Sequence, residues 1–154
     1  MSLLDNLKKN NILTKPSSKS RWDIISEMVD LAVKNKDICQ EDQEQITAAL
    51  IEREKSMSTG IGNGVAIPHC STAKVKEIVT VLAVSSKGIN FEAIDNEPVK
   101  IIILLLVPKD KLTQHIKTLA NIAKMMNDAQ LRETLLSLKT PDSILKTLKS
   151  YSLT

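Results

Sequence analysis

The stretch Val99-Lys100-Ile101-Ile102-Ile103-Leu104-Leu105-Leu106-Val107 is apolar at every position except Lys100. A strand covered on one face alternates apolar and polar residues, whereas a strand covered on both faces is apolar almost throughout. We therefore predict a central β-strand over residues 99–107 with packed layers on both sides. Its uninterrupted apolar part, Ile101–Val107, is far shorter than the roughly 20 residues that span a bilayer, so we expect no membrane insertion.

Shorter strands and several helices are predicted on either side of this central strand. The β-branched segment Ile78–Val84 and the apolar segment Gly64–Ile67 are predicted strands, and residues 10–15 hold a short edge strand. Helical periodicity and capping residues predict helices at residues 3–9, from a Ser18 or Ser20 cap through Val33, and at 40–55, 116–126, 131–138 and 142–149. This order predicts a single α/β domain over residues 1–154, with a central mixed sheet of about four to five strands and helices on both faces.

Two helical faces are expected to pack on the sheet. The residues at helical spacing on the first are Trp22, Ile25, Val29, Ala32 and Val33. Those on the second are Ile116, Leu119, Ala120, Ala123 and Met126. The second helix is expected to begin near a Thr113 cap.

Composition excludes several classes of protein. The chain has 154 residues, of which 42% are hydrophobic and 25% charged, the usual proportions of a globular domain. A net charge of only +3 and an aromatic content of 2% provide no base-stacking platform, so we expect no nucleic-acid binding. Cys39 and Cys70 lack the spacing of metal ligands, and we expect neither to carry chemistry. The polar segment 1–11 does not resemble a signal peptide, and we expect a cytoplasmic protein.

The segment Ser58-Thr59-Gly60-Ile61-Gly62-Asn63-Gly64-Val65-Ala66-Ile67-Pro68-His69 holds three of the four glycines of the chain. Glycines permit sharp turns, and successive amides in such a loop can bind an anion. Because proline cannot continue a ladder, we expect Pro68 to turn the chain out of the sheet and to present His69 at the strand end. The spacing matches neither a dinucleotide-binding fingerprint nor a P-loop. The residues alone therefore indicate a glycine loop beside a positioned histidine.

The same segment resembles the active-site signature of the fructose, mannitol and nitrogen-regulatory IIA family of the bacterial phosphotransferase system. The stretches that carry the resemblance are Arg53, Ser58–His69, Phe91–Val99, Leu104–Pro108 and His115 onward to about Met126. The sequence Ile94-Asp95-Asn96 is closer to the nitrogen-regulatory branch. The resemblance implies a phosphotransferase component that depends on phosphoenolpyruvate and carries phosphoryl as phosphohistidine.

This resemblance implies roles for His69, His115 and Arg53, and the nature of the glycine loop adds roles for Thr59 and Gly60. His69 is the expected nucleophile, which accepts phosphoryl on the ring nitrogen farther from the backbone. His115 and Arg53 are expected to stabilise the phosphoryl oxygens, and Thr59 and Gly60 to line the pocket. From the residue types alone, a structural or merely exposed role stays open for each of them. No metal or cofactor is expected, since amides and cations suffice to hold three anionic oxygens.

The resemblance also implies partners. Phosphoryl is expected to arrive from an HPr-like phosphocarrier and to pass to a IIB protein or to act as a regulatory signal to target proteins. The regulatory output is favoured over sugar uptake by a fructose or mannitol permease, and Ile61 and Val65 are expected at the centre of a transient interface. A binding module without phosphoryl transfer stays open, as does a weak homodimer. A hydrolase is disfavoured because no serine elbow is present.

Overall fold

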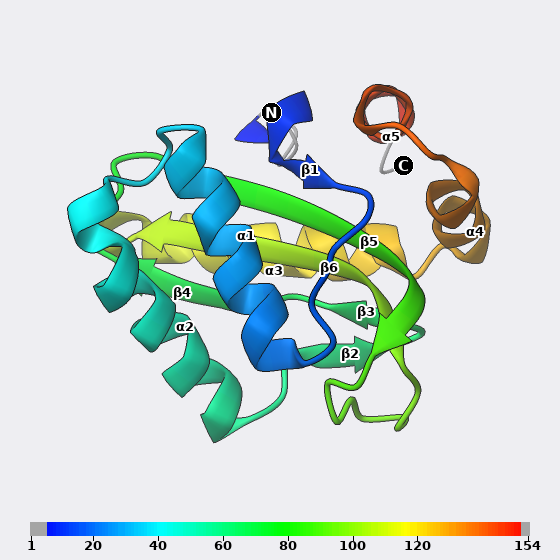
Figure 1. Ribbon diagram of the computed structural model, residues 1–154, viewed down its shortest axis with the longest axis horizontal. Coiled ribbons are helices and arrows are strands. Elements are labelled where there is room, and N and C mark those ends of the chain that lie inside the picture. Colours follow the sequence, from blue (N-terminus) through cyan, green and yellow to red (C-terminus); the bar gives the residue numbers. More distant parts are fainter. Residues whose placement is uncertain (1–5, 152–154) are drawn as a thin grey trace.

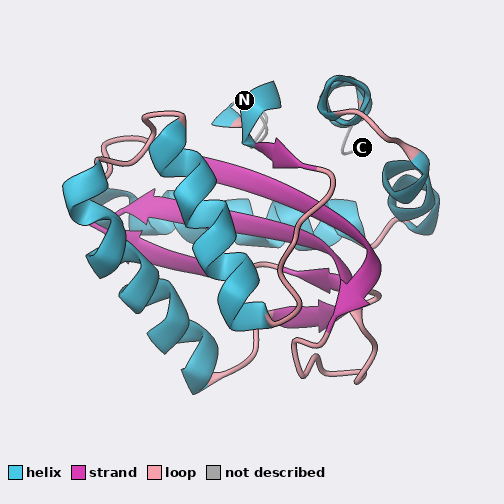
Figure 2. Cartoon of the chain, in the orientation of Figure 1, coloured by secondary structure: helices cyan, strands magenta, loops and turns pink. Residues whose placement is uncertain are grey.

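The computed structural model describes residues 6–151. Six strands within these residues form one mixed sheet (Figure 1, Figure 2). These strands are β1 (Ile12–Leu13), β2 (Gly60–Gly62), β3 (Val65–Ala66), β4 (His69–Thr72), β5 (Val79–Ile89) and β6 (Val99–Pro108). Their order is β1-β5-β6-β3-β2, and β4 also pairs with β6. The predicted α/β class is confirmed, and the sheet exceeds the expected four to five strands because short pieces at β2 and β4 join it.

Strand β6 is the centre of this sheet, as its apolar sequence predicts. On one side it pairs antiparallel with β5, and on the other it pairs parallel with β3 and then with β4. The edge strand β1 runs parallel to β5, and β2 runs antiparallel to β3. Every residue of β6 except Lys100 is buried, so both faces of the strand are covered.

Helices cover both faces of the sheet. The five α-helices of the described residues are α1 (Arg21–Lys34), α2 (Gln43–Ser56), α3 (Leu112–Met126), α4 (Ala129–Ser137) and α5 (Pro141–Ser150). Helices α1 and α2 lie in front of the sheet in Figure 1, and α3 lies behind it. Side-chain oxygens cap three of these helices, since Ser20, Asp128 and Thr140 each accept a backbone N–H from the first turn. None of the helices in residues 6–151 is long and apolar enough to cross a membrane.

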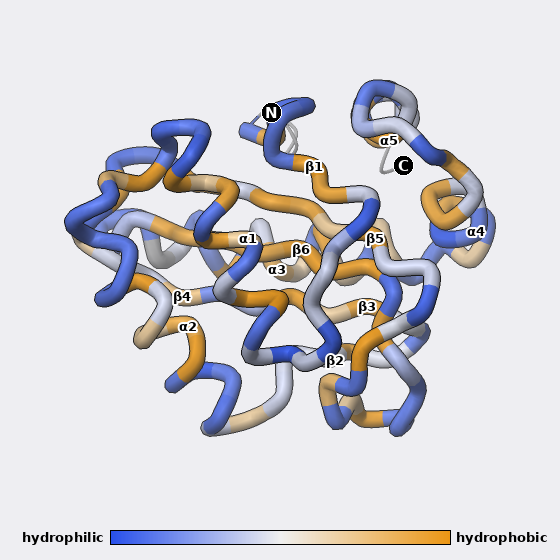
Figure 3. Tube along the Cα trace, in the orientation of Figure 1, coloured by the Kyte–Doolittle hydropathy of each residue, from blue (hydrophilic) through white to orange (hydrophobic). Residues whose placement is uncertain are grey.

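Two hydrophobic cores result, one on each face of the sheet. Ile102, Leu104 and Leu106 pack with the apolar sides of α1 and α2. Ile103 and Leu105 point to the other face and pack with α3, α4 and α5. Figure 3 shows hydrophobic residues concentrated along the central strands, with hydrophilic residues on the outer helices. The alternation along β6 therefore joins both cores through one strand.

The packed face of helix α3 is only partly the one predicted, since Met126 is buried and Leu119 packs against the core as expected. Thr118, Ile122, Met125 and Met126 are buried, whereas Ile116 is 72% exposed. Apolar residues occur on two sides of this helix, and its periodicity alone did not indicate which side meets the sheet. The cap is also different, because the N-cap position is Lys111 and its side chain makes no capping bond.

The N-terminal part also differs in detail from the prediction. The helix predicted over residues 3–9 falls partly outside the described residues, and a 3₁₀ helix follows at Lys9–Asn11. Trp22 is only half-buried, and the guanidinium of Arg21 lies 4.2 Å from the centroid of its ring. The short edge strand within residues 10–15 is confirmed as β1.

The prediction that Pro68 turns the chain out of the sheet is wrong. Strand β3 ends at Ala66, and β4 begins at His69 on the same side of β6. The carbonyl of Pro68 accepts the N–H of Leu105, so pairing with β6 continues through the proline even though it has no N–H to donate. His69 therefore lies within the sheet, opposite Leu105, and not beyond a strand end.

Candidate functional site

His69 begins strand β4 and is half-buried. Its Nδ1 lies 2.7 Å from the carbonyl oxygen of Ile67. A carbonyl can only accept a hydrogen bond, so Nδ1 carries the proton and donates it. The tautomer fixed in this way leaves the lone pair on Nε2, which is the nitrogen that the resemblance implies as the phosphoryl acceptor.

His115 lies beside this ring. The centroids of the two imidazoles are 5.3 Å apart and their planes meet at 83°. His115 stands in the first turn of α3, where N–H groups without helical partners favour an anion. Its Nδ1 is buried and has no hydrogen-bond partner among the described residues. The pair thus places a ring with an unprotonated Nε2 beside a second ring at a helix N-terminus.

Arg53 reaches the site from the last turn of α2. Its Nη1 donates to the carbonyl of Met57 at 2.8 Å, which holds the side chain against the start of the glycine loop. The guanidinium is close enough to His69 that its charge lowers the pKa of that imidazole. The structure therefore brings together His69, His115 and Arg53, although they come from three separate elements.

Burial keeps both imidazoles neutral. It lowers the pKa of His69 from its ordinary value of 6.5, and the charges of Arg53 and His115 lower it further, against the opposing effect of the bond to Ile67. Burial also lowers the pKa of His115. Both rings are therefore neutral at pH 7, and a neutral Nε2 is the form that can attack phosphorus.

We expect the His69 imidazole to titrate below pH 6.5 when followed by NMR. Because the folded-state pKa lies below the unfolded one, the unfolded chain binds more protons as the pH falls. The contribution of the neutral His69 imidazole to the free energy of unfolding is therefore fully present above pH 6.5. It is lost as the pH falls through the folded-state pKa of His69. The variant His69→Gln should flatten this part of the stability curve. A folded-state pKa at or above 6.5 contradicts the expected burial of the neutral ring.

The glycine loop is held in place by residues on other elements. Both donors of Thr59, its backbone N–H and its hydroxyl, bond to the carboxylate of Glu54. The N–H of Gly60 donates to Ser58 Oγ at 3.1 Å. A Cβ on Gly60 would come within 2.7 Å of the Ala93 Cβ, so only glycine fits there. The donors of Thr59 and Gly60 are thus engaged within the protein, which gives these two residues a structural place in the loop.

The tip of the loop is a tight turn tied to the segment before β6. Gly62, Asn63 and Gly64 all have positive φ, at 94°, 58° and 76°. The N–H of Asn63 donates to Asp95 at 3.0 Å, and the N–H of Glu97 donates to the same carboxylate at 3.1 Å. These bonds lower the pKa of Asp95, which therefore stays ionised at neutral pH and fixes the turn.

Other reactive groups of the described residues lie outside this constellation. Burial raises the pKa of the Cys70 thiol to about 11, so the residue that follows His69 stays protonated. Within residues 6–151, no group of three or more His, Cys, Asp or Glu side chains could hold a metal ion. Glu54 carries no signal of its own in the sequence, and only the fold shows that its carboxylate is buried.

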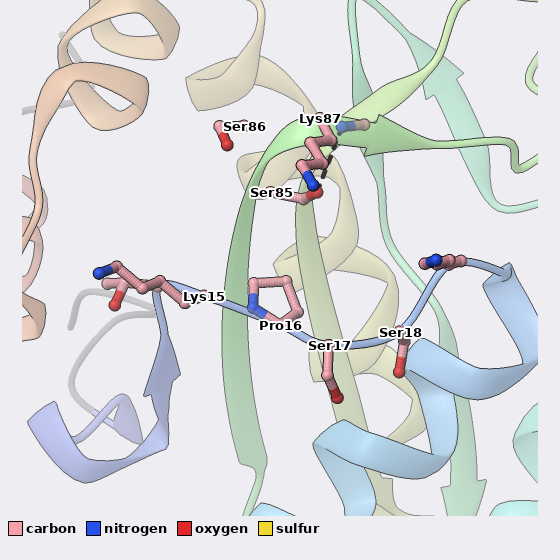
Figure 4. Close-up of a pocket in the computed structure, with 10 residues that line it drawn as sticks. Lys15, Pro16, Ser17, Ser18, Ser85, Ser86 and Lys87 are labelled. Carbon is pink, nitrogen blue, oxygen red and sulfur yellow. Dashed lines mark hydrogen bonds between the residues drawn. The ribbon is translucent and has the colours of Figure 1, made fainter.

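A separate cleft of about 450 Å³ lies between the β1–α1 connection and the end of β5 (Figure 4). It is lined by three lysines, Lys15, Lys19 and Lys87, and by hydroxyl residues. The hydroxyls of Ser17 and Ser18 donate to Glu27 of α1. The lining includes no histidine, and none of its residues belongs to the histidine site.

Comparisons with known proteins agree on one family. Residues 5–151 match the model of the family described as "Phosphoenolpyruvate-dependent sugar phosphotransferase system, EIIA 2". A nitrogen regulatory protein of Bradyrhizobium diazoefficiens is 32% identical over 119 residues, which cover 77% of this chain and 78% of that protein. The fructose-specific EIIABC component of Bacillus subtilis is 26% identical over 98% of this chain, which spans only 24% of that longer protein.

Solved structures share the fold. The nitrogen regulatory protein IIA-Ntr of Neisseria meningitidis superimposes with a TM-score of 0.85 at 27% identity, over 94% of this chain and 97% of the other. The mannitol enzyme IIA of Escherichia coli, solved as a complex with phosphorylated enzyme IIB, gives a TM-score of 0.77 at 19% identity, over 94% and 98%. Both likenesses extend over almost the whole of each chain.

Proposed function

The chain belongs to the EIIA 2 family of the phosphoenolpyruvate-dependent sugar phosphotransferase system, and on this premise we propose that His69 is the residue that carries the phosphoryl group. The main support for this proposal is the hydrogen bond from His69 Nδ1 to the Ile67 carbonyl, which leaves Nε2 free as a nucleophile. On this proposal the chain acts in the cytoplasm as one IIA domain over residues 1–154, without a metal or cofactor.

The transfer needs no proton movement. Nε2 attacks the phosphorus of a donor phosphohistidine, the new N–P bond forms, and the donor nitrogen takes back the electrons of the bond that breaks. The proton stays on Nδ1, where the carbonyl of Ile67 stabilises the positive charge that grows on the ring. The same bond fixes the orientation of the ring.

His115 and Arg53 stabilise the transferred group in this mechanism. Three phosphoryl oxygens carry negative charge, and Arg53 supplies a positive charge near them. His115 is neutral at pH 7 and lies at the N-terminus of α3, so it can donate N–H to an oxygen without competing as a nucleophile. Thr59 and Gly60 support the pocket by ordering its wall, since their donors are already bonded within the protein.

Partner proteins are proposed to dock on exposed apolar side chains near the site. The large hydrophobic side chains of Met57, Ile61, Ile94 and Ile116 are between 43% and 85% exposed, and Arg53 bonds to the carbonyl of Met57. Val65, which sequence analysis placed at this interface, is buried and belongs to the core. A few apolar contacts of this kind suit transient encounters.

An HPr-like phosphocarrier is proposed as the donor, and a IIB protein or a regulatory target as the acceptor. The mannitol enzyme IIA with the same fold forms a complex with phosphorylated enzyme IIB, which supports a IIB-like acceptor. We favour a regulatory output, because several relatives are nitrogen regulatory proteins. Uptake of fructose or mannitol is the alternative, supported by the fructose-specific relatives.

Phosphorylation in vitro tests this proposal. The full chain is incubated with phosphoenolpyruvate, enzyme I and an HPr-like carrier, each omitted in turn as a control. We expect an acid-labile, base-stable phosphoryl group on His69, located by mass spectrometry under alkaline conditions. Absence of label with both HPr and its nitrogen-branch counterpart contradicts the proposal and favours a binding module without phosphoryl transfer.

A further inference from the structure

The least exposed acidic side chain at the site belongs to Glu54, next to Arg53 in the last turn of α2. Its side chain is 0% exposed. Burial of a carboxylate is costly unless hydrogen bonds and an opposite charge compensate it. Glu54 has both, since it accepts two bonds from Thr59 and one from Arg21, whose Nη1 lies 3.3 Å away.

Arg21 connects this carboxylate to two other parts of the fold. It is the first residue of α1, and its side chain is 15% exposed. The same Nη1 donates to the carbonyl of Phe91 at 3.0 Å, and Nη2 donates to Glu92 at 3.1 Å. The carbonyl of Phe91 also accepts the hydroxyl of Ser58, at the start of the glycine loop. One guanidinium thus fixes α1, α2 and the loop to a common point.

From Glu54, hydrogen bonds lead residue by residue to the histidine. Glu54 holds Thr59 through both of its donors. The carbonyl of Thr59 accepts the N–H of Ile67 at 3.0 Å. The carbonyl of Ile67 accepts Nδ1–H of His69 at 2.7 Å. The Ile67 carbonyl, which selects the tautomer of His69, is therefore positioned by Thr59. Thr59 is in turn positioned by the buried carboxylate of Glu54.

We propose that the buried pair Arg21–Glu54 is a positioning device that, through Thr59 and Ile67, fixes the tautomer and orientation of His69. The proposal rests on His69 as the phosphoryl acceptor only for its effect on transfer. Neither Arg21 nor Glu54 contacts the imidazole, so their influence passes through the backbone of the loop. Replacement of the carboxylate by an amide removes the ion pair with Arg21 and leaves one acceptor oxygen for the two donors of Thr59, which lets the Ile67 carbonyl move relative to the ring.

The variant Glu54→Gln tests this device with two measurements. Long-range proton–nitrogen NMR reports the share of His69 protonated at Nδ1, and single-turnover transfer from the phosphocarrier reports function. We expect an almost pure Nδ1–H tautomer in the unmodified protein and a mixture in the variant. We also expect transfer to slow about tenfold, because small displacements of a reacting group reduce the rate steeply. Glu52→Gln, an exposed glutamate of the same helix, is the matched control and should change neither quantity.

A second pair of variants keeps the test decisive if Glu54→Gln does not fold. Thr59→Val removes only the hydroxyl that donates to Glu54 and leaves the ion pair with Arg21 in place. It should shift the tautomer in the same direction, and Thr59→Ser should restore it. A folded Glu54→Gln or Thr59→Val protein with the original tautomer and transfer rate overturns the proposal. The NMR measurement needs no phosphoryl transfer, so failure of His69 as an acceptor would be recognised separately.

Discussion

Replacement of His69 by alanine is expected to abolish labelling from phosphoenolpyruvate while the fold remains intact. The ring is half-buried at the start of β4 and lies outside both hydrophobic cores, so its removal leaves the packing of the sheet unchanged. It removes the nitrogen that the Ile67 carbonyl leaves unprotonated. Without the nucleophile, the rate of phosphoryl transfer to the chain should fall by at least about 10³-fold, so that no phosphorylated band is detected. Circular dichroism and thermal unfolding check the fold.

Two comparison variants make this result specific. Cys70→Ala changes the neighbouring residue, whose thiol stays protonated, and should label normally. His115→Ala keeps the nucleophile and should still accept phosphoryl, more slowly, with a larger loss in transfer onward. Label that persists in His69→Ala would place the acceptor on another residue.

The fold was predictable wherever one residue type decides the local structure. The segment 99–107, apolar except for Lys100, is typical of a strand between two covered faces, and the structure confirms it as the central strand. Thr140-Pro141 combines a capping hydroxyl with a proline at the first helical position, and α5 begins there. Local physics is sufficient in both cases, because the signal does not depend on distant residues.

Other features depend on contacts that the sequence does not reveal. Pro68 ends a ladder locally, yet β6 supplies an N–H to its carbonyl and the chain stays in the sheet. The segment Gly60–Gly62 has no strand propensity, and it becomes β2 because β3 pairs with it. Which apolar side of α3 is buried was likewise decided by the sheet, and Ile116 faces solvent.

Some residues of the site could be recognised from the sequence, and others only from the fold. His69, His115 and Arg53 were identified by resemblance, and the fold places the two rings side by side with the arginine near them. Glu54 lay unnoticed between Arg53 and Lys55 in a run of charges that is typical of a solvated helix end. Its burial became visible only when the fold placed Arg21 against it, 33 residues away in sequence.

Replacement of Arg53 by glutamine is expected to slow phosphoryl transfer about 100-fold without unfolding the protein. Glutamine can still donate to the Met57 carbonyl, but it removes the positive charge near His69. The pKa of His69 should then rise, because a charge that disfavours the imidazolium is gone. The imidazole becomes easier to protonate, and the phosphoryl oxygens lose a cation. Loss of this one charge should therefore raise the pKa of His69 and lower the transfer rate in the same variant. Single-turnover transfer and an NMR titration measure them in the same variant.

Arg53→Lys separates charge from shape. Lysine keeps the positive charge but lacks the planar fork that bonds two oxygens at once, so it should restore the low pKa of His69 while recovering only part of the transfer rate. Lys55→Gln, an exposed cation of the same helix end, should leave both quantities unchanged, which excludes a general effect of net charge. Transfer at the original rate in Arg53→Gln would show that His115 and the N-terminus of α3 alone hold the phosphoryl group.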